Sequence, residues 1–455
     1  MKNPSLLKSC IVLSLLFICN TIYADESFTV NGITYQLTST TSVAVEKMDV
    51  PHDGHVVFPS EISYRGRTFI VDQIGVNGSY SIFNNPEELI SMVIPATVTD
   101  FGASDTYYGY SKYFTNCVNL KKIVIEDSDS FISFRGSGDR RRSMFYNCPL
   151  EEVYIGRNIR YSYYIELPTE SKFASPFKKQ MGLKKVTIGD KVTELFYGMF
   201  MSCTGLEKID IPKNIQVIHY AAFSDCSSLS NVVLHEGLLS IEDDAFCYAP
   251  ISSVTLPNSI VKLGEGCMAG NKLKTLIIND NIKEIPNRAF NSSTLTKVVI
   301  GKAVKKIGIS VFGNSSIEEL ECRMQNPEDC SVYDSWEEKT FALNNYTWTI
   351  LYVPYGTIEK YKATWPWRNF VSIVEGSPSG VEQVNTNDIY IQSEGGVFIV
   401  QNVKNDTPVS VYNANGIQVG STICKGGYAT INTYLLHGSI AFVKIGAKIF
   451  KVLVE

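Results

Sequence analysis

Apolar and polar positions repeat through the middle of the chain. A phenylalanine, or once a methionine, recurs at steps of 22 or 23 residues after Phe177 and of 31 or 32 residues before it. Five or six residues later, an apolar anchor begins the frame apolar-x-x-apolar-x-apolar, as in LEKIDI. Its last two apolar residues alternate with period two, which predicts a short, half-buried β-strand. The recurring positions are Phe83, Phe114, Phe145, Phe177, Phe200, Phe223, Phe246, Met268, Phe290 and Phe312.

Each unit is expected to form one coil of a solenoid. A proline or glycine often follows the strand, and two further apolar residues then recur at a spacing of three. The five or six buried side chains of one unit contribute about 1.5–3 kcal/mol each. That gain is smaller than the backbone entropy lost, about 1–2 kcal/mol for each of roughly 22 residues. Stacked units bury each other's apolar edges. The sequence therefore predicts a mainly β solenoid of about ten units of 22–32 residues, with short parallel strands.

The two ends of the chain differ from the repeats. Residues 1–24 carry Lys2 and Lys8, then an apolar run and a small residue, Ala24, which is the pattern of a secretory signal peptide. The apolar run is shorter than the roughly 20 residues that span a bilayer. Lipidation at Cys19 remains an alternative. At the other end, alternating segments around the hairpin signal Asn415-Gly416 predict a small β-sandwich over residues 389–455.

The expected division of the mature chain has five parts. Residues 25–82 form a β-rich N-terminal cap, residues 83–330 the solenoid, residues 331–375 its C-terminal cap, residues 376–388 a linker and residues 389–455 the β-sandwich. The chain's four tryptophans, Trp336, Trp348, Trp365 and Trp367, lie in the C-terminal cap. We expect them to cover the last coil, with a sugar-binding platform as the alternative.

The repeats resemble a known family. AAFSDCSSLSNVVLHEGLLSIEDDAF, ISSVTLPNSIVKLGEGCM and LKTLIINDNIKEIPNRAF are similar to BspA-like, or treponemal-type, leucine-rich repeats of exported Bacteroidota proteins, and the likeness spans residues 83–321. The resemblance implies a secreted or cell-surface protein that adheres to an extracellular protein or glycan. Residues 389–455 loosely resemble C-terminal domains that include type IX sorting signals, so sorting, attachment and a passive spacer all remain open.

Composition and candidate chemistry argue against several classes of function. A net charge of −5 and an isoelectric point near 5.7 do not fit nucleic-acid binding. The two outward columns of the predicted strands hold no histidine and no serine–histidine pair, and their one close pair of carboxylates, Glu319 and Glu321, is interpreted as a charged end-strand. The five histidines are scattered and C-x₂-C spacing is absent, so neither a metal nor a cofactor is expected. The alternatives to binding are a glycan- or peptide-hydrolysing enzyme and a passive cell-surface scaffold.

Cysteines follow the repeat. Cys117, Cys148, Cys203 and Cys226 each lie three residues after a recurring phenylalanine, which predicts a buried column without chemistry. Cys322 and Cys330 are the better candidates for a disulfide, and their state is left open.

Three early insertions supply the candidate binding residues. The long steps leave about nine extra residues in three consecutive units, and inserts at one repeat position project from one side. They are rich in tyrosine and arginine, which are enriched at binding hot spots. Mutual packing of the aromatic residues is the alternative. Tyr154, on the outward side of a predicted strand, is added to them. The candidates are Tyr107, Tyr108, Tyr110, Tyr113, Arg140, Arg141, Arg142, Tyr154, Tyr161, Tyr163 and Tyr164.

Overall fold

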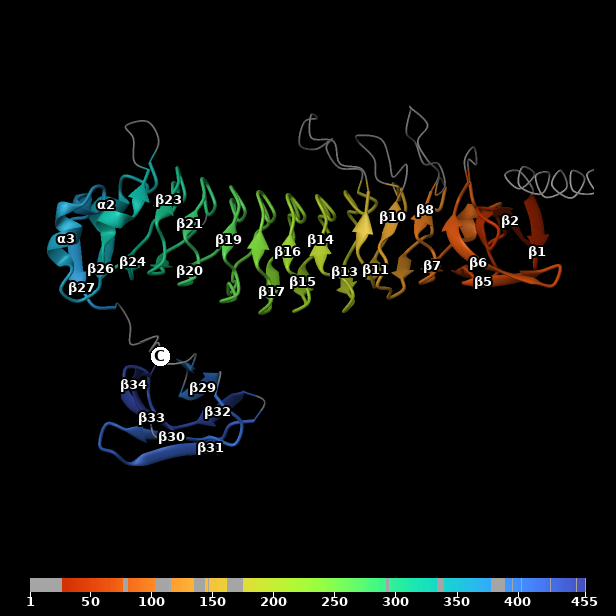
Figure 1. The fold of residues 1–455 in the computed structure, drawn as a ribbon. Helices are drawn as coiled ribbons and strands as arrows, with labels where there is room; N and C mark the ends of the chain where they lie inside the picture. Colours follow the sequence, from red (N-terminus) through yellow and green to blue (C-terminus); the bar gives the residue numbers. More distant parts are fainter. Residues whose placement is uncertain are drawn as a thin grey trace, which may run out of the picture.

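The protein is a stack of coils followed by a β-domain, as the computed structural model shows (Figure 1). The structure describes residues 27–76, 81–102, 114, 116–134, 144–145, 147–161, 175–291, 294–333, 339–377, 389–394, 396–401, 403–425, 427–446 and 448–454.

One row of parallel strands contains the predicted frame residues. In each four-residue strand the second and fourth side chains point inward, as Ile209 and Ile211 do in β15, and the first and third point outward. We call the outward side the strand face. Its strands are β4 (His55–Val57), β7 (Ser91–Ile94), β9 (Lys122–Ile125), β11 (Glu152–Ile155), β13 (Lys185–Ile188), β15 (Lys208–Ile211), β17 (Asn231–Leu234), β20 (Thr275–Ile278), β22 (Lys297–Ile300), β24 (Glu319–Cys322), β26 (Ile350–Val353) and β27 (Ser372–Glu375).

A second row of shorter strands lies on another side of the coils. It pairs in parallel and continues from the sheet of the N-terminal cap. The cap strands are β1 (Ser27–Val30), β2 (Ile33–Leu37), β3 (Ser42–Lys47), β5 (Glu61–Tyr64) and β6 (Arg67–Ile74). The second row comprises β8 (Asp100–Phe101), β10 (Ile132–Phe134), β12 (Ile159–Arg160), β14 (Glu194–Leu195), β16 (Val217–Ile218), β18 (Ser240–Ile241), β19 (Lys262–Leu263), β21 (Glu284–Ile285), β23 (Lys306–Ile307) and β25 (Ser331–Val332).

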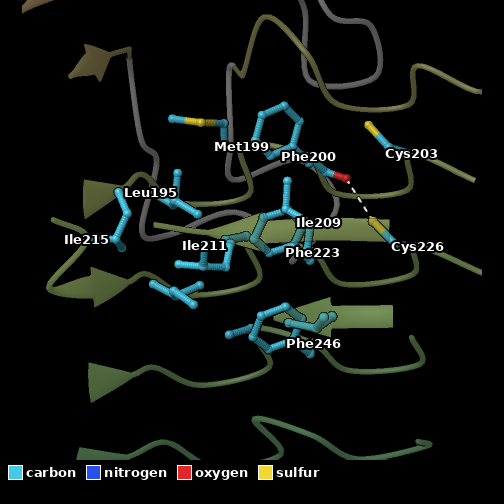
Figure 2. Close-up of a cluster of buried hydrophobic side chains, with 14 of the residues drawn as sticks. Leu195, Met199, Phe200, Cys203, Ile209, Ile211, Ile215, Phe223, Cys226 and Phe246 are labelled. Carbon is cyan, nitrogen blue, oxygen red and sulfur yellow. Dashed lines mark hydrogen bonds between the residues drawn. The ribbon is translucent and has the colours of Figure 1, made fainter. Parts of the chain in front are cut away.

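The recurring phenylalanines form a column in the core, in which the buried Met268 takes the place of one ring. Phe223 is fully buried and stacks on Phe200 and Phe246, with ring centroids 5.4 and 5.2 Å apart (Figure 2). Beside this column, the Cys226 thiol donates to the carbonyl of Phe200 at 3.1 Å. Burial raises the pKa of Cys226 to about 12. This confirms that the cysteine column is part of the packing.

The strand-face row is divided into separate sheets, with one break between β13 and β15 and another after β17. A strand is predicted over residues 251–256, but only an isolated bridge from Asn231 to Ser253 forms there, and β20 starts a new sheet. The interruption coincides with a change in repeat length. Phe223 lies six residues before its anchor Leu229, whereas Phe246 lies five residues before Ile251. The same five-residue connection separates Phe145 from Leu150, whose strand β11 pairs with both neighbours, so connection length alone does not account for the break.

The C-terminal cap departs from two sequence predictions. Trp367 is fully buried, but Trp348 is 81% and Trp365 is 49% exposed, so these two rings do not cover the coil. Tyr346 takes the inward position of its short helix and packs on Phe370 instead. Nor is β24 an end-strand, because β26 and β27 extend the sheet beyond it. The helices are α2 (Asn345–Trp348), α3 (Ile358–Ala363) and the 3-10 turns η1 (Pro86–Glu88), η3 (Pro327–Asp329) and η4 (Trp367–Asn369).

Antiparallel strands with their own buried core follow from Tyr390. The Asn415-Gly416 turn joins β30 to β31, and Gly416 has a φ of 77°. The first sheet contains β28 (Tyr390–Glu394), β29 (Val397–Gln401) and β32 (Tyr428–Asn432). The second contains, in spatial order, β31 (Gln418–Ile423), β30 (Pro408–Asn413), β33 (Ile440–Ile445) and β34 (Lys448–Leu453).

Candidate binding face

Most of the predicted binding residues lie in the three insertions, outside the residues that the structure describes. These are Tyr107, Tyr108, Tyr110, Tyr113, Arg140, Arg141, Arg142, Tyr163 and Tyr164. The described residues before each insertion belong to β8, β10 and β12, which pair in parallel. The three insertions therefore start from adjacent strands of the second row, as the repeat position predicts.

Tyr161 belongs to the core rather than to a binding surface. Its ring is 8% exposed and packs edge-on against Phe196, and its hydroxyl donates to the carbonyl of Tyr197 at 2.8 Å. Burial raises the pKa of this hydroxyl above its ordinary range. We therefore leave Tyr161 out of the candidate surface.

Tyr154 does point outward on the strand face. Its hydroxyl lies 2.9 and 3.0 Å from the carboxylate oxygens of Asp127 and donates to them. Burial and the Asp127 carboxylate raise the pKa of Tyr154. The next coil has Gly189 beside this hydroxyl, where a Cβ atom would lie 2.7 Å from the oxygen. Tyr154 is thereby held in a fixed orientation by its neighbours.

An apolar stripe runs along the strand face from the N-terminal cap to Tyr154. Because β4, β7, β9 and β11 pair in register, Val57 lies beside Val93, Val93 beside Val124, and Val124 beside Tyr154. Val57 is 67% exposed, and the other three are half-buried. None of these side chains faces the core, so the stripe is available to a partner.

Charged residues lie along both sides of this stripe. At the start of the strands, Glu152 pairs with Lys122 at 3.3 Å and with Lys185 at 2.6 Å. One position earlier, Glu151 is shared in the same way by Lys121 and Lys184. Each row thus has two lysines for one glutamate, and the lysines lower the pKa of both carboxyls. After the strands come exposed carboxylates such as Asp127 and Asp190. Exposed ion pairs of this kind add little stability.

A histidine bridges three coils on the second row, which the sequence analysis did not foresee. His219 lies 2.9 Å from Glu194 through Nε2 and 3.0 Å from Glu242 through Nδ1, with its side chain 13% exposed. Burial opposes the charged imidazole, but the hydrogen bonds to Glu242 and Glu194 outweigh it and raise the pKa of His219. The hydrogen bond with His219 in turn lowers the pKa of Glu242. His219 and Glu242 are 23 residues apart, which is the repeat step in this part of the chain. The repeat spacing could therefore have predicted this contact.

Glu319 and Glu321, the close pair of carboxylates found in the sequence, lie on β24. Glu319 pairs with Lys297 at 3.1 Å, and Glu321 with Arg323 at 2.7 Å, so both carboxylates have a basic partner. A small cavity lined by residues 302–329, at the end of the repeats, includes the ion pair of Lys305 and Asp329 in its lining. In the described part of the chain no cluster of histidine, cysteine and carboxylate side chains could hold a metal ion, and no helix is long and apolar enough to cross a bilayer.

A family model matches the repeats of this chain. It describes a BspA type leucine-rich-repeat region, and it matches residues 78–165, 141–261 and 218–328. These overlapping segments cover more than half of the 455 residues. A search of curated proteins finds no match.

Solved structures of bacterial repeat proteins are also similar to the chain. A leucine-rich-repeat protein from Bacteroides ovatus is 17% identical, and the match covers 65% of this chain and 94% of that one, with a TM-score of 0.28. A leucine-rich cell surface protein from Faecalibacterium prausnitzii is 19% identical over 76% and 98% of the two chains, with a TM-score of 0.30. The pneumococcal vaccine antigen PcpA is 17% identical over 77% and 99%, with a TM-score of 0.34. The family match, rather than these distant structures, identifies the repeat.

Proposed function

Because the chain belongs to the BspA type leucine-rich-repeat family, we propose that it is a secreted or cell-surface protein that binds an extracellular protein or glycan on its strand face. The observation that carries this proposal is the outward apolar stripe from Val57 to Tyr154 between rows of opposite charge. Aromatic and apolar side chains at the centre of a polar rim are the usual anatomy of a binding site.

The order of the chain supports the same proposal. The predicted signal peptide over residues 1–24 would export the protein, and a stack of coils offers an extended surface to a partner. The tyrosines and arginines of the three insertions, which lie outside the described residues, would add a second contact on the side of β8, β10 and β12. The hydrolase alternative would require catalytic residues. The family model that matches this chain describes a leucine-rich-repeat region and therefore favours binding.

The experiment is a binding screen with a face variant and a matched control. Residues 25–455 are applied to an array of extracellular-matrix proteins and glycans. The face variant is Val57→Asp with Val93→Asp. The control is Leu239→Asp with Val261→Asp, which introduces the same charges at exposed positions, 43% and 54%, beside β18 and β19 of the second row.

We expect the face variant to lose at least about tenfold in affinity, since two anchors of a binding site each contribute more than about 1 kcal/mol, while the control binds like the parent. Equal binding by all three proteins would contradict the strand face as the site. No capture by any folded protein would favour the passive scaffold, and turnover of an arrayed glycan or peptide would favour the hydrolase.

A further inference from the structure

The C-terminal domain carries an apolar and basic face on its last two strands. In the pairing of β33 with β34, Ile440 lies opposite Leu453, Phe442 opposite Lys451, and Lys444 opposite Ile449. The residues between them, such as Val443 and Phe450, are buried in the domain core, so these six side chains point outward. Ile449 is 64%, Leu453 41% and Ile440 38% exposed. We call the six residues the outer patch.

Neighbouring segments extend the patch without adding a negative charge. On β30, Tyr412 lies beside Phe442, and Ser410 lies beside Lys444. The turn that leads into β33 exposes Leu436 by 78% and Tyr434 by 97%. None of the four strands β30, β31, β33 and β34 contains an aspartate or a glutamate. Contiguous exposed apolar residues of this kind mark an interaction site, and the lysines give it a positive sign.

The domain also differs in charge from the rest of the chain. Residues 389–455 contain five lysines and three carboxylate side chains, whereas residues 1–388 contain the other 36 basic and 43 acidic residues. The domain is therefore positive and the remainder is negative. A negatively charged surface would therefore attract this domain more than the rest of the chain.

We propose that the outer patch binds the surface of an anionic lipid bilayer. The exposed isoleucines and leucine would enter the boundary between headgroups and acyl chains, and Lys444 and Lys451 would pair with lipid phosphates, as in other peripheral membrane contacts. A lipid surface fits better than a protein because the patch is an unbroken sheet face that combines apolar groups with cations, and the strands that form it contain no carboxylate to pair with a protein's basic groups. The proposal is independent of the strand face, so either can fail alone.

The test is co-sedimentation of residues 25–455 with lipid vesicles. Starting at residue 25 removes the apolar run of the predicted signal peptide, which could insert by itself. We expect binding to phosphatidylcholine vesicles that contain about one third phosphatidylglycerol, much weaker binding to phosphatidylcholine alone, and a decrease with added salt. Replacing Lys444→Glu and Lys451→Glu together should lower partitioning by at least about 25-fold, since each juxtamembrane lysine contributes roughly fivefold.

A matched control separates the patch from net charge. Lys404→Glu with Lys425→Glu makes the same charge change in the same domain, but on turns outside β33 and β34, and should lower partitioning by less than about fivefold. Lys444→Arg with Lys451→Arg should retain binding, and Ile449→Ser with Leu453→Ser should weaken it about tenfold or more. Circular dichroism of each variant establishes that it is folded.

Three results would overturn the proposal. These are equal losses for the two charge-reversal pairs, equal binding to neutral and anionic vesicles, and retention by immobilised polyglutamate without binding to vesicles. The last result would assign the patch to an acidic protein instead.

Discussion

Replacing His219 with glutamine is expected to loosen the solenoid in a pH-dependent way. The imidazole joins Glu194 of one coil to Glu242 two coils later, at 2.9 and 3.0 Å. The rings of Phe196 and Tyr197 also pack on it. Glutamine is shorter and uncharged, so it can donate to one carboxylate at most and leaves both charges unbalanced.

The size of the effect follows from the burial of the three groups. Hydrogen bonds to charged groups contribute about 1.5–3 kcal/mol when they are shielded from water. The carboxylates of Glu194 and Glu242 are 29% and 26% exposed, so water recovers part of the loss. We expect the free energy of unfolding to fall by about 2–4 kcal/mol at pH 6.

The pH dependence has a definite sign. The folded pKa of His219 is raised, so its contribution is complete below the ordinary histidine pKa of about 6.5 and is lost as the pH rises through the folded value. The folded pKa of Glu242 is lowered, so its contribution is complete above about 4.3 and is lost as the pH falls further. The bridge should therefore be strongest between about pH 4.5 and 6.5.

Guanidinium unfolding at pH 6 and pH 9, followed by circular dichroism, measures this difference. The matched control is His235→Gln, because His235 pairs with the exposed Asp210, at 2.8 Å, and its side chain is 46% exposed. The control should change stability by less than about 1 kcal/mol. Equal losses for the two variants, or a loss for His219→Gln that is the same at both pH values, would refute the bridge.

Three further predictions concern the core. Phe223→Ala should lower the free energy of unfolding by about 3–5 kcal/mol, since its ring is buried between two others; in urea unfolding, a loss no larger than that of the exposed Tyr248→Ala would contradict the column. Gly264→Ala should cost about 1–3 kcal/mol because its Cβ would collide with the backbone of Asp243, whereas Gly313→Ala has no atom closer than 3.4 Å and should be tolerated, as thermal unfolding would show. The described cysteines, including Cys322 and Cys330, are buried and unpaired, so mass spectrometry should find no alkylation at pH 8 without denaturant, and rapid native labelling would contradict the packing.

The repeat was predictable from sequence because it depends on local spacing. Each phenylalanine and its anchor are separated by five or six residues, so Phe223 and Leu229 could be assigned to one coil without knowledge of the others. Both are fully buried in the structure. The parallel pairing of neighbouring coils could also be predicted, because one coil alone buries too little apolar surface to offset the backbone entropy that it loses.

Contacts between coils were harder to predict, because each insertion changes the number of residues that separate equivalent positions in neighbouring coils. Arg157 is buried and donates to the carbonyls of Pro95 and Ala96, about 60 residues earlier, and nothing in its neighbourhood indicates this partner. The same holds for Tyr154 and Asp127, which are 27 residues apart in units of irregular length. In the cap, composition alone could not distinguish the buried Trp367 from the exposed Trp348.

Hydrogen–deuterium exchange of the chain bound to its captured partner tests the strand face most directly. A bound partner should slow amide exchange in β4, β7, β9 and β11, where the apolar stripe lies, and leave β19, β21 and β23 of the second row unchanged. Protection confined to the second row or to residues 389–455, with β7 and β9 exchanging as in the free protein, would contradict binding on the strand face.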